Sequence, residues 1–171
     1  MEPSDRSSLA LREIARYPET QLKSTPIMRH RRILVVHANE NDRHSVAIML
    51  RVAGYETDTA STGSEAIRLI DRFPYSLVLS DLRMQGLDGP ALYRRLAARR
   101  RGAPPPIVFL SESPYASDYA AFLVETGVSI FTKPLVPGKL WQVVENTLLT
   151  PPPTDNPARD RMSHDRLVKT S

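Results

Sequence analysis

Short apolar segments alternate with helix-spaced segments from about residue 31 to residue 150, and this alternation restricts the fold more than any other feature. The predicted strands are 33–36, 55–60, 76–80, 106–110 and 128–132. The predicted helices, in which apolar residues recur every three or four positions, are 41–53, 65–72, 89–101, 114–126 and 136–149. Strands that alternate with helices form a parallel sheet covered by helices on both faces, so we predict a doubly wound α/β fold.

The segments on either side of this alternating region differ from it in composition. Residues 1–30 contain a single stretch with helical spacing, residues 7–17, which Pro18 and Pro26 bring to an end. Residues 151–171 begin with a proline-rich run and then stay polar, which is typical of a disordered tail. We therefore predict an N-terminal extension with a short helix, one folded domain over 31–150, and a disordered tail.

Composition and charge exclude several classes of protein. The chain has no cysteine, which excludes disulfides, thiolate metal sites and a cysteine nucleophile. Its apolar runs are much shorter than the roughly 18 residues of a membrane span, and no hydrophobic signal core begins the chain, so we expect a cytoplasmic protein without membrane contact. The net charge of +4 is spread along the chain, and the arginine clusters 29–32 and 94–101 lack interleaved aromatic residues, which disfavours nucleic-acid binding.

Polar side chains follow the predicted strands at the edge of the sheet where the carboxyl ends meet. His37, Asp81, Ser111 and Lys133 come directly after the first, third, fourth and fifth predicted strands. In open parallel sheets this edge carries the binding site. A carboxylate, a hydroxyl and an ammonium that converge there indicate a functional site more readily than three unrelated turn or surface residues.

These residues lie in motifs that resemble the receiver domain of bacterial two-component response regulators. The matching segments are 76–89, around the family's phosphate-accepting aspartate, 107–111, its switch strand, and 131–134, its Lys-Pro motif. The separations of 30 residues from Asp81 to Ser111 and 22 residues from Ser111 to Lys133 are also typical of that family. The resemblance covers about residues 31–150 and implies a flavodoxin-like, five-stranded parallel sheet with the strand order 2-1-3-4-5.

The resemblance also implies a function. A histidine kinase or phosphotransfer protein would donate a phosphoryl group to Asp81, in a phosphorelay. Ser111 would bind a phosphoryl oxygen, and Lys133 would pair with the phosphate and with Asp81. Mg²⁺ would be held by Asp81 and the backbone carbonyl of Arg83. Phosphorylation would then alter the surface of the fourth and fifth helices, where a downstream protein partner would bind.

The largest departure from the family pattern follows the first strand. The family has two acidic residues there, and this chain has His37 and Ala38. Alanine has no ligand atom and Mg²⁺ prefers oxygen, so we expect Mg²⁺ binding to be weak or absent. Glu40 is the candidate for a substitute oxygen ligand, although its position favours an exposed residue at a helix start. For His37 we favour a strand-end histidine held by hydrogen bonds over a nucleophile or base.

Two further departures concern the last two strands. Glu112 follows Ser111 at a position where the family has a small residue, and its carboxylate would repel a phosphoryl group unless it turns to solvent. Ile130 stands where the family has the aromatic residue of the switch. The neighbouring Phe131 should face the other side of the sheet, because side chains alternate along a strand.

Three functions remain open on these residues. Retention of Asp81, Ser111 and Lys133 supports a phosphorelay receiver, whereas loss of the acidic pair supports a degenerate pseudo-receiver that binds a partner without phosphorylation or Mg²⁺. The remote alternative is a phosphatase of the haloacid dehalogenase type, which needs a second aspartate where this chain has Arg83. No segment outside 31–150 is long enough for an output domain, so we expect a stand-alone, non-enzymatic receiver. A homodimer through the N-terminal helix or the fourth and fifth helices is left open.

Overall fold

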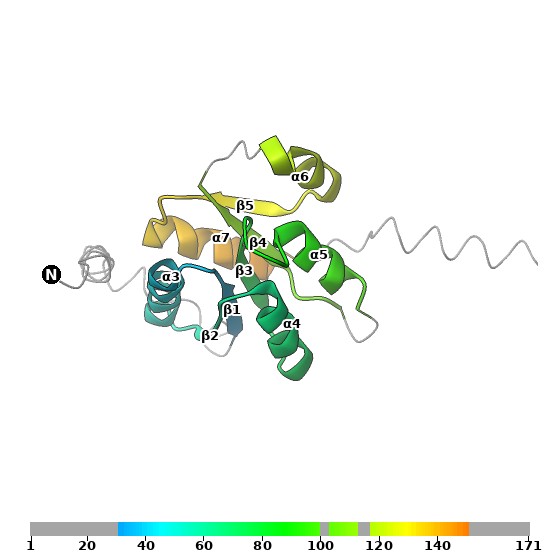
Figure 1. Ribbon diagram of the computed structural model, residues 1–171. Helices are drawn as coiled ribbons and strands as arrows, with labels where there is room; N and C mark the ends of the chain where they lie inside the picture. The colour runs from blue at the N-terminus through cyan, green and yellow to red at the C-terminus, as the bar shows by residue number, and fades with distance from the viewer. Residues whose placement is uncertain (1–30, 100–102, 113–116, 151–171) are drawn as a thin grey trace, which may run out of the picture.

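A computed structural model of the chain describes residues 31–99, 103–112 and 117–150. Within them lies a five-stranded parallel sheet in the order β2-β1-β3-β4-β5, which confirms the predicted fold (Figure 1). The strands are β1 (Arg32–Val36), β2 (Glu56–Ala60), β3 (Leu77–Asp81), β4 (Ile107–Ser111) and β5 (Ser129–Thr132). The helices are α3 (Glu40–Val52), α4 (Gly63–Arg72), α5 (Gly89–Ala97), the 3-10 helix η2 (Ser117–Tyr119), α6 (Ala120–Thr126) and α7 (Pro137–Leu149).

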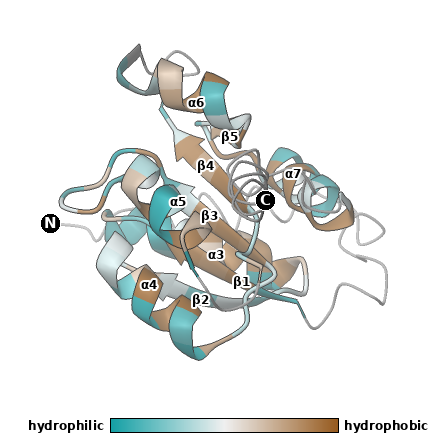
Figure 2. Cartoon of the chain, turned by 90° about the vertical axis from the view of Figure 1, so that its right-hand side faces the viewer, coloured by the Kyte–Doolittle hydropathy of each residue, from teal (hydrophilic) through white to brown (hydrophobic). Residues whose placement is uncertain are grey.

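Helices cover both faces of the sheet, which explains why its central strands are apolar. Side chains of α3 and α7 form the core on one face, and those of α4, α5 and α6 form the core on the other. All of β4 is buried, and so is β3 up to its last residue, and both strands are hydrophobic in Figure 2. β2 lies at the edge of the sheet and is only partly buried, which agrees with the polar residues in its sequence.

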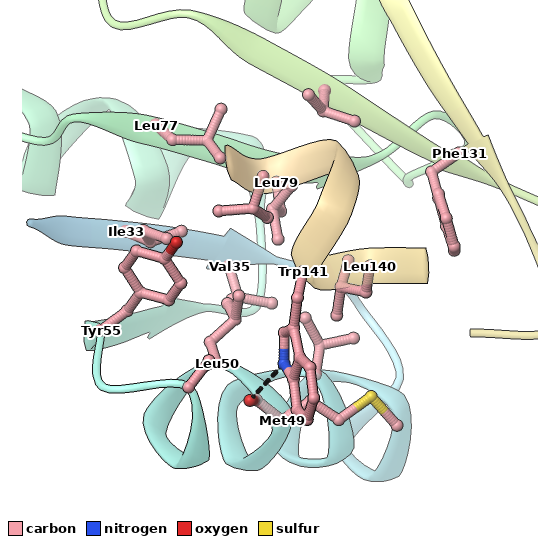
Figure 3. Packing of buried hydrophobic residues seen from close by; sticks show 14 of the residues in the cluster. Ile33, Val35, Met49, Leu50, Tyr55, Leu77, Leu79, Phe131, Leu140 and Trp141 are labelled. Atoms are coloured by element: carbon pink, nitrogen blue, oxygen red, sulfur yellow. Dashed lines mark hydrogen bonds between the residues drawn. The ribbon is translucent and has the colours of Figure 1, made fainter. Parts of the chain in front are cut away.

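The helices α3 and α7 are joined by a hydrogen bond inside the first of these cores. The indole Nε1 of Trp141 in α7 donates to the backbone carbonyl of Met49 in α3 at 2.8 Å (Figure 3). Trp141 is only 5% exposed, so this bond gives its single polar group a partner within the core. The two helices are thereby fixed side by side under β1 and β3.

Close backbone contacts fix the loop between β3 and α5. At Gly89 an added Cβ would lie 2.8 Å from the ring of Phe109 and 2.9 Å from the carbonyl oxygen of Leu82. At Gly63, the first residue of α4, it would lie 2.6 Å from the carbonyl oxygen of Leu87. Only glycine allows these approaches, so the loop after β3 is packed against both α4 and β4.

Two predicted helices have different bounds in the structure. α5 ends at Ala97 rather than at residue 101, and the side chain of Arg99, beyond this end, donates to the carbonyl of Ile70 and pairs with the carboxylate of Asp71. α6 begins at Ala120, after a 3-10 turn, and its N-cap Tyr119 supplies no side-chain hydrogen bond. It ends at Thr126, as predicted, and Gly127 follows it in a left-handed conformation that caps the helix.

The predicted N-terminal extension, the tail and the start of the fourth helix at residues 114–116 lie outside the described residues. Among the residues that are described, no helix combines the length and the apolar character that crossing a membrane requires.

Candidate functional site

Asp81 is the last residue of β3, and its side chain lies at the carboxyl edge of the sheet, 16% exposed. Burial raises the pKa of its carboxyl group, because removal from water disfavours the charged form. His37, Lys133 and hydrogen bonds from the backbone of Arg83 and Leu82 oppose this rise. Asp81 is thus a partly desolvated carboxyl group, and a small part of its side chain remains exposed to solvent.

His37 follows β1 and is almost completely buried, with 3% of its surface exposed. Its backbone N–H donates to the carbonyl of Ala60 in β2 at 3.1 Å, and its ring Nδ1 accepts from the backbone N–H of Asn39 at 3.1 Å. Its Nε2 lies 3.6 Å from Oδ2 of Asp81. Burial is the largest cause that lowers the pKa of His37, and the ammonium of Lys133 lowers it further. The residue has the contacts of a strand-end histidine held in place by hydrogen bonds.

Lys133 comes directly after β5 and points back over the sheet edge. Its backbone N–H donates to the carbonyl of Ser111 at 2.8 Å, so its position continues the pairing of β4 and β5. Its Nζ lies 3.2 Å from Oδ2 of Asp42, 3.0 Å from Nε2 of His37 and 4.0 Å from Oε1 of Glu112. Within the described residues its ion pairs are those with Asp42 and Glu112, whereas the resemblance implied a pair with Asp81.

The register of the sheet brings Ser111 to the same edge as Asp81. Asp81 pairs with Leu110 of β4, one residue before the end of that strand, and Ser111 pairs with Thr132, the last residue of β5, so the three strands end within one residue of each other. Ser111 is the buried last residue of β4. The next residue, Glu112, has a side chain that is 88% exposed, so its carboxylate faces solvent. The structure therefore brings the predicted carboxylate, hydroxyl and ammonium together.

Asp42 belongs to this cluster although the sequence did not single it out. It lies in the first turn of α3, where its backbone N–H is capped by Oδ1 of Asn39 at 3.1 Å. Its carboxylate, 32% exposed, faces Lys133 and lies 3.6 Å from Nε2 of His37. Glu40, the candidate substitute ligand in the same turn, is exposed to solvent. One feature of the chain could have identified Asp42. Because α3 starts only four residues after β1, its first turn lies beside the strand ends.

The donors at this edge do not suit Mg²⁺. The positions of the family's acidic pair hold a nitrogen ligand, at His37, and a methyl group, at Ala38. The carboxylate of Asp42 is engaged by the ammonium of Lys133, which itself lies among the groups that a cation would need. Among the described residues, no group of three or more histidine, aspartate or glutamate side chains is arranged to hold a metal ion. Mg²⁺ prefers several oxygen ligands in octahedral geometry.

The position of the switch aromatic is occupied as the alternation predicts. Phe131 is buried, 8% exposed, in the core that contains α3 and α7. Ile130 is partly buried and packs on the opposite core, with α4, α5 and α6. The aromatic ring of β5 is therefore held in the interior, on the other side of the sheet from the position the family uses.

Arg83 has its side chain outside the site. Its guanidinium is 74% exposed and pairs with Oδ2 of Asp118 at 3.1 Å. It stands where a phosphatase of the haloacid dehalogenase type would need its acid. A guanidinium in that place stays protonated and supplies no acid–base function, so the geometry offers that chemistry no second carboxylate there.

The chain matches a known protein family. The family model for the response regulator receiver domain matches residues 33–145. The chain is 30% identical over 116 residues to the transcriptional regulatory protein GlrR of Escherichia coli, a match that covers 67% of this chain and 26% of GlrR. It is 31% identical over 130 residues to the sensor histidine kinase GacS of Pseudomonas protegens, which covers 74% of this chain and 14% of GacS.

Solved structures show the same fold. The chemotaxis response regulator CheY4 of Vibrio cholerae superposes with a TM-score of 0.63 at 22% identity, over 69% of this chain and 98% of that one. The response regulator TrrA of Thermotoga maritima, in complex with Mg²⁺ and BeF, gives a TM-score of 0.59 at 28% identity, over 68% of this chain and 98% of that one. The chain belongs to the family of response regulator receiver domains, the signalling modules of two-component systems.

Proposed function

We propose that this receiver domain accepts a phosphoryl group on Asp81 from a histidine kinase or a phosphotransfer protein. One observation carries the proposal: Asp81, Ser111 and Lys133 lie together at the carboxyl edge of the sheet, at the ends of the neighbouring strands β3, β4 and β5. The carboxylate supplies the nucleophile, and the hydroxyl and the ammonium can meet the negative charge that arrives with phosphate.

The reaction is an in-line transfer between a nitrogen and an oxygen. An oxygen of Asp81 attacks the phosphorus of a phosphohistidine, and the O–P bond forms as the N–P bond breaks. The electron pair of the broken bond goes to the imidazole nitrogen of the donor, which takes up a proton from water. The product is an aspartyl phosphate on Asp81. The donors at the site do not fit Mg²⁺, and the transfer uses none.

Intact-mass measurement after incubation with acetyl phosphate tests this proposal. The full chain and its Asp81→Asn variant are compared, each with millimolar Mg²⁺ and with EDTA. We expect a phosphoryl adduct on the wild-type protein that is lost in the variant and depends little on Mg²⁺. An adduct of equal amount in both proteins, or none in the wild type with either acetyl phosphate or a phosphorylated histidine kinase domain, would contradict it.

A second candidate function, a pseudo-receiver that binds its partner without phosphorylation, is favoured by the pairing of Lys133 with Asp42. This ion pair already satisfies the ammonium in the absence of phosphate. Under this candidate, the Asp81→Asn variant would bind the kinase or other partner with unchanged affinity and would support signalling in cells as well as the wild type does. Loss of signalling in that variant, with the fold retained, favours the phosphorelay.

The output of the domain is proposed to be contact with another protein through α6 and α7. Val124 on α6 is 86% exposed, an unusual exposure for a large aliphatic side chain. Leu149, at the end of α7, is also exposed, at 68%. The substitution Val124→Asp should weaken binding of the downstream protein and leave phosphorylation of Asp81 unchanged, which separates the output surface from the phosphorylation site.

A further inference from the structure

The contacts of Lys133 include a carboxylate, that of Asp42, which would compete with a phosphoryl group for its ammonium. A neutral imidazole has one acceptor nitrogen, and two donors approach the ring of His37, the backbone N–H of Asn39 at Nδ1 and Nζ of Lys133 at Nε2. One ring nitrogen cannot satisfy both, so one donor needs another acceptor. For Lys133 that acceptor is Oδ2 of Asp42, at 3.2 Å.

Asp42 is also the anion that allows His37 and Lys133 to lie so close together. Its Oδ2 lies 3.6 Å from Nε2 of His37, so one carboxylate oxygen faces both nitrogens. The side chain of Lys133 is 17% exposed, and its charge is therefore poorly screened by water without this carboxylate. Oδ1 of Asn39 caps the backbone N–H of Asp42, which fixes the turn that presents the carboxylate.

We infer that Asp42 is a positioning residue that holds Lys133 in a resting place away from Asp81, and that a phosphoryl group on Asp81 has to draw Lys133 from Asp42. The ammonium of Lys133 thus acts as an internal cation of the resting site. The inference rests on the proposed function of Asp81 for its second half, whereas the contact between Asp42 and Lys133 stands on the geometry alone.

Competition of this kind predicts that removal of the Asp42 charge strengthens binding of a phosphate mimic. Beryllofluoride, the probe present in the TrrA complex, is titrated into the full chain and followed by ¹⁹F NMR, with and without Mg²⁺. We expect Asp42→Asn to bind it about threefold to fivefold more tightly than the wild type, the size expected for release of a partly exposed ion pair. The gain should disappear in the double variant Asp42→Asn with Lys133→Met.

Two controls separate this effect from general electrostatics and from misfolding. Glu40→Gln removes the same charge from the same turn of α3 at an exposed position, and its affinity should stay within twofold of the wild type. Thermal unfolding of Asp42→Asn, Lys133→Met and the double variant measures the contact directly. The loss of Tm in the double variant should be smaller than the two single losses together.

The outcomes separate the contact between Asp42 and Lys133 from the phosphorylation of Asp81. Additive Tm losses overturn the inference even if the wild type is phosphorylated on Asp81. Where the wild type binds beryllofluoride, an Asp42→Asn variant that binds it no more tightly also overturns the inference. A gain that persists without Lys133 also overturns it. Non-additive Tm losses with no beryllofluoride bound by any of the proteins support Asp42 as the holder of Lys133 and contradict the proposed phosphorylation instead.

Discussion

Nε2 of His37 lies 3.6 Å from Oδ2 of Asp81, across the carboxyl ends of the adjacent strands β1 and β3. Burial is the largest influence on both groups, and it lowers the pKa of the imidazole and raises the pKa of the carboxyl. Each shift disfavours the charged form of its group, so burial opposes the formation of an ion pair between His37 and Asp81.

His37 should make the free energy of unfolding depend on pH. Its folded-state pKa lies below the ordinary value of 6.5, so the unfolded chain binds the proton more readily. Stability from this group is therefore present above about pH 6.5 and is lost as the pH falls toward the lower folded-state pKa. Urea unfolding between pH 5 and 8 should show this loss in the wild type and a smaller one in His37→Gln. His44→Gln, at an exposed position of α3, should keep the wild-type dependence.

Asp81 should oppose stability at neutral pH. The pKa of its carboxyl is raised by burial, so the folded state holds the proton more tightly, and ionisation above the ordinary value of 3.8 works against folding. We expect Asp81→Asn to raise the Tm at pH 8, where His37 is neutral in both states. A lower Tm would mean that attraction to His37 and Lys133 outweighs the burial of the charge.

Asp42, in contrast to Asp81, should stabilise the folded domain. Its ion pair with Lys133 is partly exposed, so Asp42→Asn should cost about 0.5–1 kcal/mol of the free energy of unfolding. Chemical unfolding at low and high salt is the measurement, since screening weakens exposed pairs and should narrow the difference from wild type. A loss of several kcal/mol would instead place the pair among buried networks.

Phe131 should matter more for stability than for signalling. It is 8% exposed in the core beneath β5, so Phe131→Ala should cost about 3–5 kcal/mol, the usual price of a large cavity. Ile130→Ala, which truncates a partly buried side chain on the other face, should cost less. Urea denaturation of both variants compares them, and equal losses would contradict the placement of the two side chains.

Gly89 should tolerate no side chain. An added methyl group would meet the ring of Phe109 at 2.8 Å and the backbone of Leu82 at 2.9 Å, so the loop after β3 would have to move. We expect Gly89→Ala to destabilise the domain by roughly 1–3 kcal/mol. The same variant should slow phosphorylation of Asp81, because this loop begins directly after it. Wild-type values in both measurements would show that the loop yields freely.

Most of the fold could be predicted because its signals are local and repeated. The runs 33–36 and 107–110 have no polar residue, as strands buried under two helix layers require, and the structure places both in the middle of the sheet. The bounds that were wrong lie where the pattern is weak. Residues 98–101 keep a helical composition, yet α5 ends at Ala97 and the side chain of Arg99 contacts α4.

The site could be predicted only in part, for a different reason. The ends of the strands can be recognised in the sequence, so the positions of Asp81, Ser111 and Lys133 predict that they lie at the carboxyl edge of the sheet. Asp42 lies on a helix and has the appearance of an ordinary acidic residue in a first turn, which the helix dipole also favours. Only the three-dimensional structure shows that this carboxylate faces Lys133, because sequence periodicity contains no such distance.

The helix α3 therefore makes two contacts with other parts of the domain, one at the carboxyl edge of the sheet and one in the core. Near its start, Asp42 holds the ammonium of Lys133, and two turns later the carbonyl of Met49 receives the indole of Trp141 from α7. Seven residues of α-helix span about 10 Å, so the two contacts lie about that far apart along α3. A displacement of α7 would therefore also move Asp42, because α3 connects the hydrogen bond in the core to the ion pair of Lys133 at the carboxyl edge of the sheet.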